Sequence, residues 1–197
     1  MALGKSHVTF DNYILSMIRT IQPNTIVDLG CGLGKVGELV KVSSLRSKLP
    51  SGFTLTGVNP LFNKEEDRDL LLSKGYDNIL DLSIKDYCEE YIDQQIDLFT
   101  ALDVLEHLPR SDVFSILDML LYRSKFVLII WPSRHPQLAE GDPYKAHRSS
   151  FVLRDLATSF EVVSYLTTGF APISSVHNYS LCLLRGHMFL SQMPPII

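Results

Sequence analysis

Residues 26–38 read IVDLGCGLGKVGE, and this stretch decides the fold of the chain. An apolar run ends abruptly in alternating glycines, and the residues that follow permit a helix. Glycine adopts positive φ without steric cost and lets a ligand approach main-chain N–H groups closely. The stretch therefore predicts a buried strand, a tight turn and a helix start. The turn is a candidate ligand-binding loop, with its glycines at Gly30, Gly32 and Gly34.

Several interpretations of these glycines compete. A turn without a ligand needs only one or two glycines, so their number here favours a ligand. A phosphate-binding loop of the form G-x-x-x-x-G-K-[S/T] is excluded, because Gly34-Lys35 is followed by Val36. The dinucleotide-binding pattern G-x-G-x-x-G is present from Gly32 to Gly37, but it is a weak signal alone. A dehydrogenase would also need further chain for its substrate, and the elements assigned next leave none.

Strand-like and helical patterns alternate over most of the chain. This alternation predicts an α/β fold with a doubly wound, mostly parallel sheet and helices on both faces. In such sheets ligands bind beyond the carboxyl ends of the strands. Helices are predicted at residues 9–21, after the glycines, at 63–75 and 84–94, from 111, and at 149–159, and strands at 25–29, 53–58, 78–82, 96–102, 126–131, 161–167 and 179–185.

Composition bounds the class of protein. With 197 residues and a net charge of −4, the chain is predicted to form a single acidic domain over 1–197, with its core at about 10–186. We find no dense basic cluster, which disfavours a nucleic-acid partner. The widely spaced cysteines, the lack of a signal peptide and the short apolar runs predict a cytoplasmic protein that does not enter membranes. The apolar tail at 187–197 predicts docking on its own domain or a homo-oligomer contact.

Two motifs resemble those of one enzyme family. The run from Val27 to Gly34 resembles the first motif of class I S-adenosylmethionine-dependent methyltransferases, D/E-x-G-x-G-x-G. The run from Asp97 to Leu108, which ends in Asp103-Val-Leu-Glu-His-Leu, resembles the fourth-strand motif of a subgroup that reads D-x-L-E-H-L. This resemblance implies a Rossmann-like, seven-stranded sheet with an antiparallel final strand and S-adenosylmethionine as the cofactor.

The resemblance also assigns residues to the methyl donor. The family holds the donor's ribose with a carboxylate after the second strand, where this chain carries Asn59, an amide without charge. An acidic residue after the third strand often meets the adenine, and either Asp81 or Ser83 occupies that place; Ser83 with Asp86 is also a plausible helix cap. The expected cofactor-binding residues are Asp28, Gly30, Cys31, Gly32, Gly34, Asn59, Asp81, Ser83 and Asp103.

Candidate catalytic residues follow the fourth and fifth strands. Methyl transfer is an in-line displacement that needs alignment and exclusion of water, and a base only where the acceptor must lose a proton. Asp103, His107 and His147 are the candidates. The long loop at 132–148 is predicted to be a substrate lid with Tyr144 and Arg148 as substrate-binding residues. A metal site built from Glu106 and His107 with His135 or His147 lacks a ligand spacing, so no metal is predicted.

The sequence therefore predicts a methyltransferase that uses S-adenosylmethionine on a small-molecule acceptor. The small-molecule acceptor follows from the acidic balance and from the lack of an inserted domain. The alternative is a non-catalytic protein of the same fold with a weakened donor site, a regulator or scaffold, which Asn59 and the Asp81/Ser83 ambiguity motivate. A protein that binds NAD is the less favoured reading.

Overall fold

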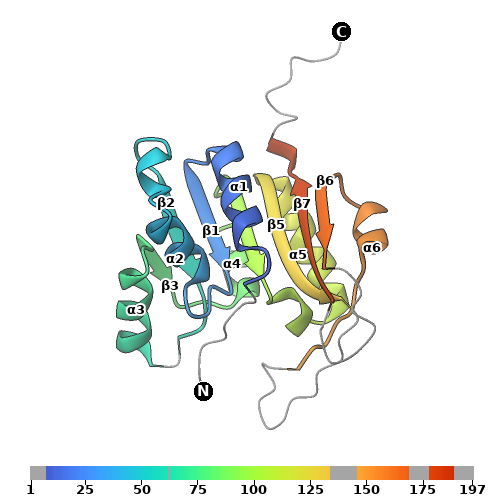
Figure 1. Cartoon of the computed structure of the whole chain (residues 1–197). Coiled ribbons are helices and arrows are strands. Elements are labelled where there is room, and N and C mark those ends of the chain that lie inside the picture. Colours follow the sequence, from blue (N-terminus) through green and yellow to red (C-terminus); the bar gives the residue numbers. More distant parts are fainter. Residues whose placement is uncertain (1–7, 62, 134–145, 169–177, 189–197) are drawn as a thin grey trace. The chain divides into compact units, whose positions relative to one another are not determined.

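The computed structural model describes residues 8–61, 63–133, 146–168 and 178–188 (Figure 1). Its strands form one mixed sheet in the order β3-β2-β1-β4-β5-β7-β6, which confirms the predicted α/β fold with an antiparallel final strand, β7. In chain order the elements are α1 Asp11–Ile21, β1 Thr25–Leu29, α2 Lys35–Val42, η1 Arg46–Lys48, β2 Thr54–Val58, α3 Lys64–Ser73, β3 Asn78–Leu80, α4 Ile84–Glu90, β4 Ile96–Leu102, η2 Leu105–His107, α5 Arg110–Tyr122, β5 Ser124–Ser133, α6 Leu153–Ala157, β6 Val162–Thr167 and β7 Asn178–Arg185.

Contacts divide the chain into two compact units, Met1–Thr100 and Ala101–Ile197. β4 carries the chain from the first unit into the second. The single domain expected from the length therefore stays a prediction. The apolar tail lies largely outside the described residues. None of the helices described is long and apolar enough to cross a membrane.

The first unit is built on parallel strands. β1 pairs with β2, and β2 pairs with β3, in parallel register (Figure 1). β1 and β4 are almost wholly buried, which explains why both read as near-continuous apolar runs. α1 turns Ile14 and Ile18 inward at helical spacing, and α3 lies beside β3. The carboxyl ends of β1 and β2 both lead into loops that carry expected donor residues.

The second unit is built on antiparallel strands. β7 lies between β5 and β6 and runs antiparallel to both. α5 packs on β5 and η2 through its apolar side, and α6 contacts β6 (Figure 1). The Trp131 ring at the end of β5 stacks on Phe151 with 4.9 Å between centroids, and its indole N–H donates to the Phe151 carbonyl at 2.9 Å. This contact holds the segment before α6 against β5.

The predicted cap of α4 is confirmed, whereas two other local predictions were wrong. The Ser83 hydroxyl accepts from the Asp86 N–H at the start of α4. Asn63 with Glu66 three residues on is the sequence pattern of a capping pair and predicts one at the start of α3. Asn63 instead makes no side-chain cap, and its own N–H donates to Asp67. The last helix begins at Leu153 and not near 149, because the backbone of the preceding residues bonds to η2.

Candidate functional site

The glycine turn after β1 has the left-handed backbone that the sequence predicts. Gly30, Gly32 and Gly34 have φ values of 65°, 50° and 82°. The N–H groups of Gly30 and Cys31 both donate to the Val58 carbonyl, at 2.8 and 3.2 Å, which ties the turn to the end of β2. Within the described residues, the N–H groups of Gly32 and Leu33 donate no hydrogen bond. The turn thus presents main-chain donors just before the N-terminus of α2.

Asp28 is a buried brace beneath this turn. Its carboxylate accepts one hydrogen bond from the Tyr76 hydroxyl and one, at 2.6 Å, from the Thr100 hydroxyl. Burial raises the pKa of Asp28 to about 6, although both hydrogen bonds act to lower it. Each carboxylate oxygen of Asp28 therefore accepts a hydrogen bond from a side chain of the protein itself. Asp28 thus links β1 to Tyr76 and to Thr100, and its expected contact with the methyl donor stays a prediction.

Tyr76 is a residue that the sequence analysis missed. Besides its bond to Asp28, its ring occupies the space of two absent side chains. A Cβ on Gly37 would lie 2.5 Å from Tyr76 Cε2, and one on Gly57 would lie 3.0 Å from Tyr76 Cδ1. Gly37 was the last glycine of the dinucleotide-like pattern. The Tyr76 ring explains this glycine by close packing, which is also the role of the third glycine in a dinucleotide-binding turn, so Gly37 does not distinguish the two kinds of ligand.

The loop after β2 holds the next expected donor residues. The half-buried Asn59 donates from Nδ2 to the Pro60 carbonyl at 2.8 Å. Asp81, after β3, accepts from the Leu61 N–H at 2.9 Å and pairs with Lys64 at 3.3 Å. The Leu61 hydrogen bond is the main cause that lowers the pKa of Asp81. Asp81 thus anchors the loop that follows Asn59, while Ser83 caps α4.

In the second unit, Asp103 turns the chain at the end of β4. Its φ of 54° lies in the left-handed region, which aspartate tolerates better than most residues, and its N–H donates to the Ile130 carbonyl at 2.9 Å. The turn leads directly into η2, where the Glu106 side chain is only 2% exposed. Glu106 Oε2 is buried without a hydrogen-bond partner in the described part of the chain. Burial, followed by repulsion from Asp103, raises the pKa of Glu106 to about 8.

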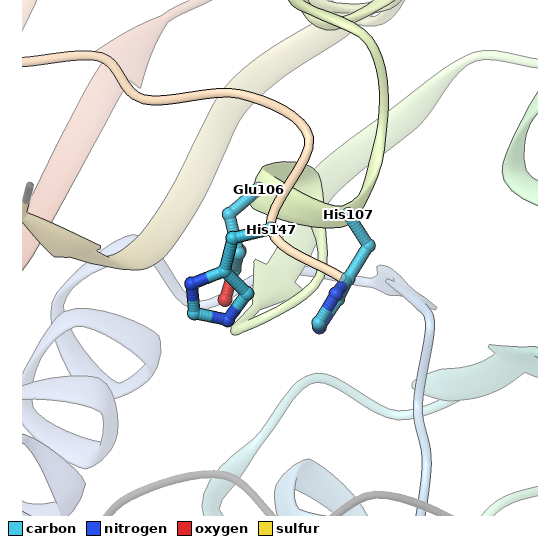
Figure 2. Close-up of side chains that lie close together, drawn as sticks. All are labelled: Glu106, His107 and His147. Carbon is cyan, nitrogen blue, oxygen red and sulfur yellow. The ribbon is translucent and has the colours of Figure 1, made fainter. Parts of the chain in front are cut away.

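Residues 146–149 lie against η2 and complete a cluster of Glu106, His107 and His147 (Figure 2). The N–H groups of Arg148 and Ser149 donate to the Glu106 carbonyl at 2.7 and 3.0 Å. His107 Nδ1 lies 3.2 Å from the Ala146 carbonyl, and the two imidazole rings meet edge to face at 5.1 Å. The backbone bonds thus place a histidine from a distant loop beside Glu106 and His107.

Other predicted substrate residues are less defined. The Arg148 side chain is exposed, and the bond that the structure records for this residue is made by its backbone. Tyr144 and His135 lie outside the described residues. Tyr179 on β7 lies near Asp103 and Glu106, and burial followed by the charges of these two residues raises the pKa of its hydroxyl. The sequence does not predict this proximity, because Tyr179 is far from both residues along the chain.

Comparison with solved structures places the fold. TehB from Haemophilus influenzae aligns with a TM-score of 0.62 and 16% identity over 89% of this chain, which spans 62% of that protein. A SAM dependent methyltransferase from Archaeoglobus fulgidus aligns at 0.59 and 16% identity, over 89% of this chain and 94% of that one. The N-methyltransferase NodS from Bradyrhizobium japonicum aligns at 0.60 and 12% identity, over 91% and 97%.

The chain has the fold of the S-adenosylmethionine-dependent methyltransferases. No protein-family model matches the sequence, and no curated protein matches it. Because the identities are low, the similarity to methyltransferases is a similarity of fold alone. Any function has to be argued from the residues of the two units.

Proposed function

We propose that the protein transfers a methyl group from S-adenosylmethionine to a small-molecule acceptor. The observation that carries the proposal is the turn of left-handed glycines after β1, with main-chain N–H groups presented above a buried Asp28. The donor has no phosphate, and the turn lacks the hydroxyl residue that follows the Gly-Lys pair of a phosphate loop, because Val36 follows Gly34-Lys35. A methyltransferase of this fold from Synechocystis, which acts on magnesium protoporphyrin IX, was solved with bound SAM; it is 17% identical and aligns with a TM-score of 0.53.

The residues of the first unit suit the parts of such a donor. The N–H groups of Gly32 and Leu33 are available to its carboxylate. Asn59 Oδ1 accepts no hydrogen bond from the described residues and would take one ribose hydroxyl as an acceptor. Asp81 already accepts a hydrogen bond from Leu61 and pairs with Lys64. It would therefore position the loop beside the adenosine and would not contact the adenosine itself. The bound donor supplies an electrophilic methyl group.

The second unit supplies groups that can handle a proton. The Ala146 carbonyl holds the proton of His107 on Nδ1, so the lone pair lies on Nε2. A lone pair of this kind can accept a proton from an acceptor hydroxyl or amine. We assign His107 and His147 as the candidate bases of the metal-free protein and Asp103 as the residue that positions η2. The net charge of −4 supports a small molecule over a nucleic acid.

Donor binding is the first expected result. S-adenosylmethionine or S-adenosylhomocysteine at about a hundred times its Kd should stabilise the full chain by about 2.7 kcal/mol, because ligands that bind only the folded state stabilise it by mass action. Thermal unfolding and calorimetry measure this, with NAD as the comparison. A response to NAD alone, or none to either sulfur nucleoside at millimolar concentration, would overturn the proposal.

Asn59→Asp should tighten donor binding by about 1 kcal/mol, or roughly fivefold in Kd, because a charge-assisted bond to the ribose replaces a neutral one. The variant also loses the bond from Nδ2 to Pro60, so the new carboxylate is free to turn to the ribose. Asn63→Asp, the same chemical change at an exposed position before α3, is the control and should leave Kd unchanged. Equal or weaker binding by Asn59→Asp would show that Asn59 does not hold the ribose.

A non-catalytic protein of the same fold is the second candidate. The observations that favour it are the uncharged Asn59 and the engagement of Asp81 and Ser83 in local bonds. Such a protein would bind the sulfur nucleosides weakly and would produce no S-adenosylhomocysteine with any acceptor. Calorimetry combined with a screen of small-molecule acceptors separates the two candidates.

A further inference from the structure

We propose that Glu106, His107 and His147 bind a divalent first-row transition-metal ion. One ligand atom from each of these side chains lies within 4.8 Å of the others, and all three belong to the second unit (Figure 2). The sequence alone predicts no metal, because these residues have no ligand spacing. The fold creates the spacing by bringing residue 147 onto η2.

The Glu106 carboxylate is the observation that points to an ion. Its Oε2 atom is buried with no hydrogen-bond partner among the described residues, and Figure 2 shows the carboxylate directed toward the two imidazoles. A buried carboxylate oxygen without a partner is costly, and a cation is the partner that compensates for it best. The neighbouring groups are imidazoles, which bind metals in their neutral form.

The surrounding backbone prepares both histidines for binding. The Ala146 carbonyl lies 3.2 Å from His107 Nδ1 and accepts that nitrogen's proton, which makes Nε2 the nitrogen that can bind a metal; metal-binding histidines are usually oriented by such a bond. The N–H groups of Arg148 and Ser149 donate to the Glu106 carbonyl at 2.7 and 3.0 Å, so the loop that carries His147 is fastened directly to the residue that carries the carboxylate. The Ser149 hydroxyl adds a bond to the Leu105 carbonyl.

The size and chemistry of the cluster suit one small ion. Metal–ligand bonds of about 2.0–2.2 Å place the ligands of a tetrahedral ion roughly 3.4 Å apart, so the three side chains need to close by on the order of 1 Å. Two imidazoles and one carboxylate favour zinc, iron, cobalt or manganese over magnesium and calcium, which prefer oxygen ligands alone. Three protein ligands also leave positions open for water or for a substrate oxygen.

The test is titration of the chelator-treated full chain with Zn²⁺, and with Mg²⁺ for comparison, followed by calorimetry. We expect one equivalent of Zn²⁺ to bind at least a hundredfold more tightly than Mg²⁺. Glu106→Gln and His147→Asn should each weaken Zn²⁺ binding at least a hundredfold. His187→Gln, at an exposed histidine outside the cluster, is the matched control and should bind as the wild type does.

A Co²⁺ absorption spectrum gives a second readout. Visible bands should appear in the wild type and in His187→Gln, and they should be lost in His147→Asn, whose half-exposed site lowers the risk of misfolding. The proposal is overturned if the wild type binds no stoichiometric ion, or if both cluster variants bind Zn²⁺ like the wild type. No methyl donor is present in these experiments, so their outcome is independent of the proposed methyl transfer.

Discussion

Replacing Gly37 by valine is expected to destabilise the protein by about 3 kcal/mol or more, the cost of overpacking a well-filled core. The first added carbon alone would lie 2.5 Å from Tyr76 Cε2, 2.7 Å from Cδ2 and 3.0 Å from the Lys74 carbonyl. Tyr76 has no easy way to move aside, because its hydroxyl is bonded to Asp28 and its ring also fills the space above Gly57. Urea unfolding measures the loss.

A double-mutant cycle tests the reason for this loss. Tyr76→Ala removes the ring that the valine would strike, so Gly37→Val should cost at least about 1 kcal/mol less in the Tyr76→Ala background. Additive losses would mean that the ring is not what excludes a side chain at Gly37. The single variant should also weaken binding of the methyl donor, because Gly37 lies in the first turn of α2, directly after the glycine turn.

The second large effect is a pH-dependent loss of stability caused by Asp28. Its pKa is about 6 in the folded chain against an ordinary 3.8, so the folded state holds this proton more tightly than the unfolded state. Its contribution is therefore fully present below pH 3.8 and is lost as the pH rises through about 6. The shift corresponds to about 3 kcal/mol in total, of which roughly half is lost above pH 5.

Asp28→Asn isolates this contribution from those of the other groups. An amide does not titrate and can still bond both Tyr76 and Thr100, so the stability of the wild type relative to Asp28→Asn should fall between pH 5 and 7.5. Unfolding free energies from urea titrations across this range provide the measurement. Parallel curves for the two proteins would contradict a folded-state pKa of about 6 for Asp28. Thr100→Val removes a bond that lowers the pKa of Asp28 and should move the fall to higher pH.

Elements defined by neighbouring residues were predictable. β1 and β4 have the predicted bounds because each is a short apolar run between clear turn signals. The cap by Ser83 also needs only a hydroxyl directly before a helix, within reach of the N–H group three residues later. The pairing of Asn63 with Glu66 had the same local pattern and was wrong, since Asp67 competes for the same N–H group.

The sequence by itself determined the glycine turn, the alternation of strands and helices and the resemblance to the methyltransferases, because each depends on residues close together in the chain. The tertiary structure alone decided what supports the turn and what surrounds η2. Tyr76 meets Asp28 across 48 positions, and His107 meets Ala146 across 39. Contacts at such separations depend on how the strands pair and where the loops lie in the folded chain, and neither can be predicted from the local periodicity of the sequence. The brace under the glycines and the Glu106–His107–His147 cluster therefore appear only when the chain is folded.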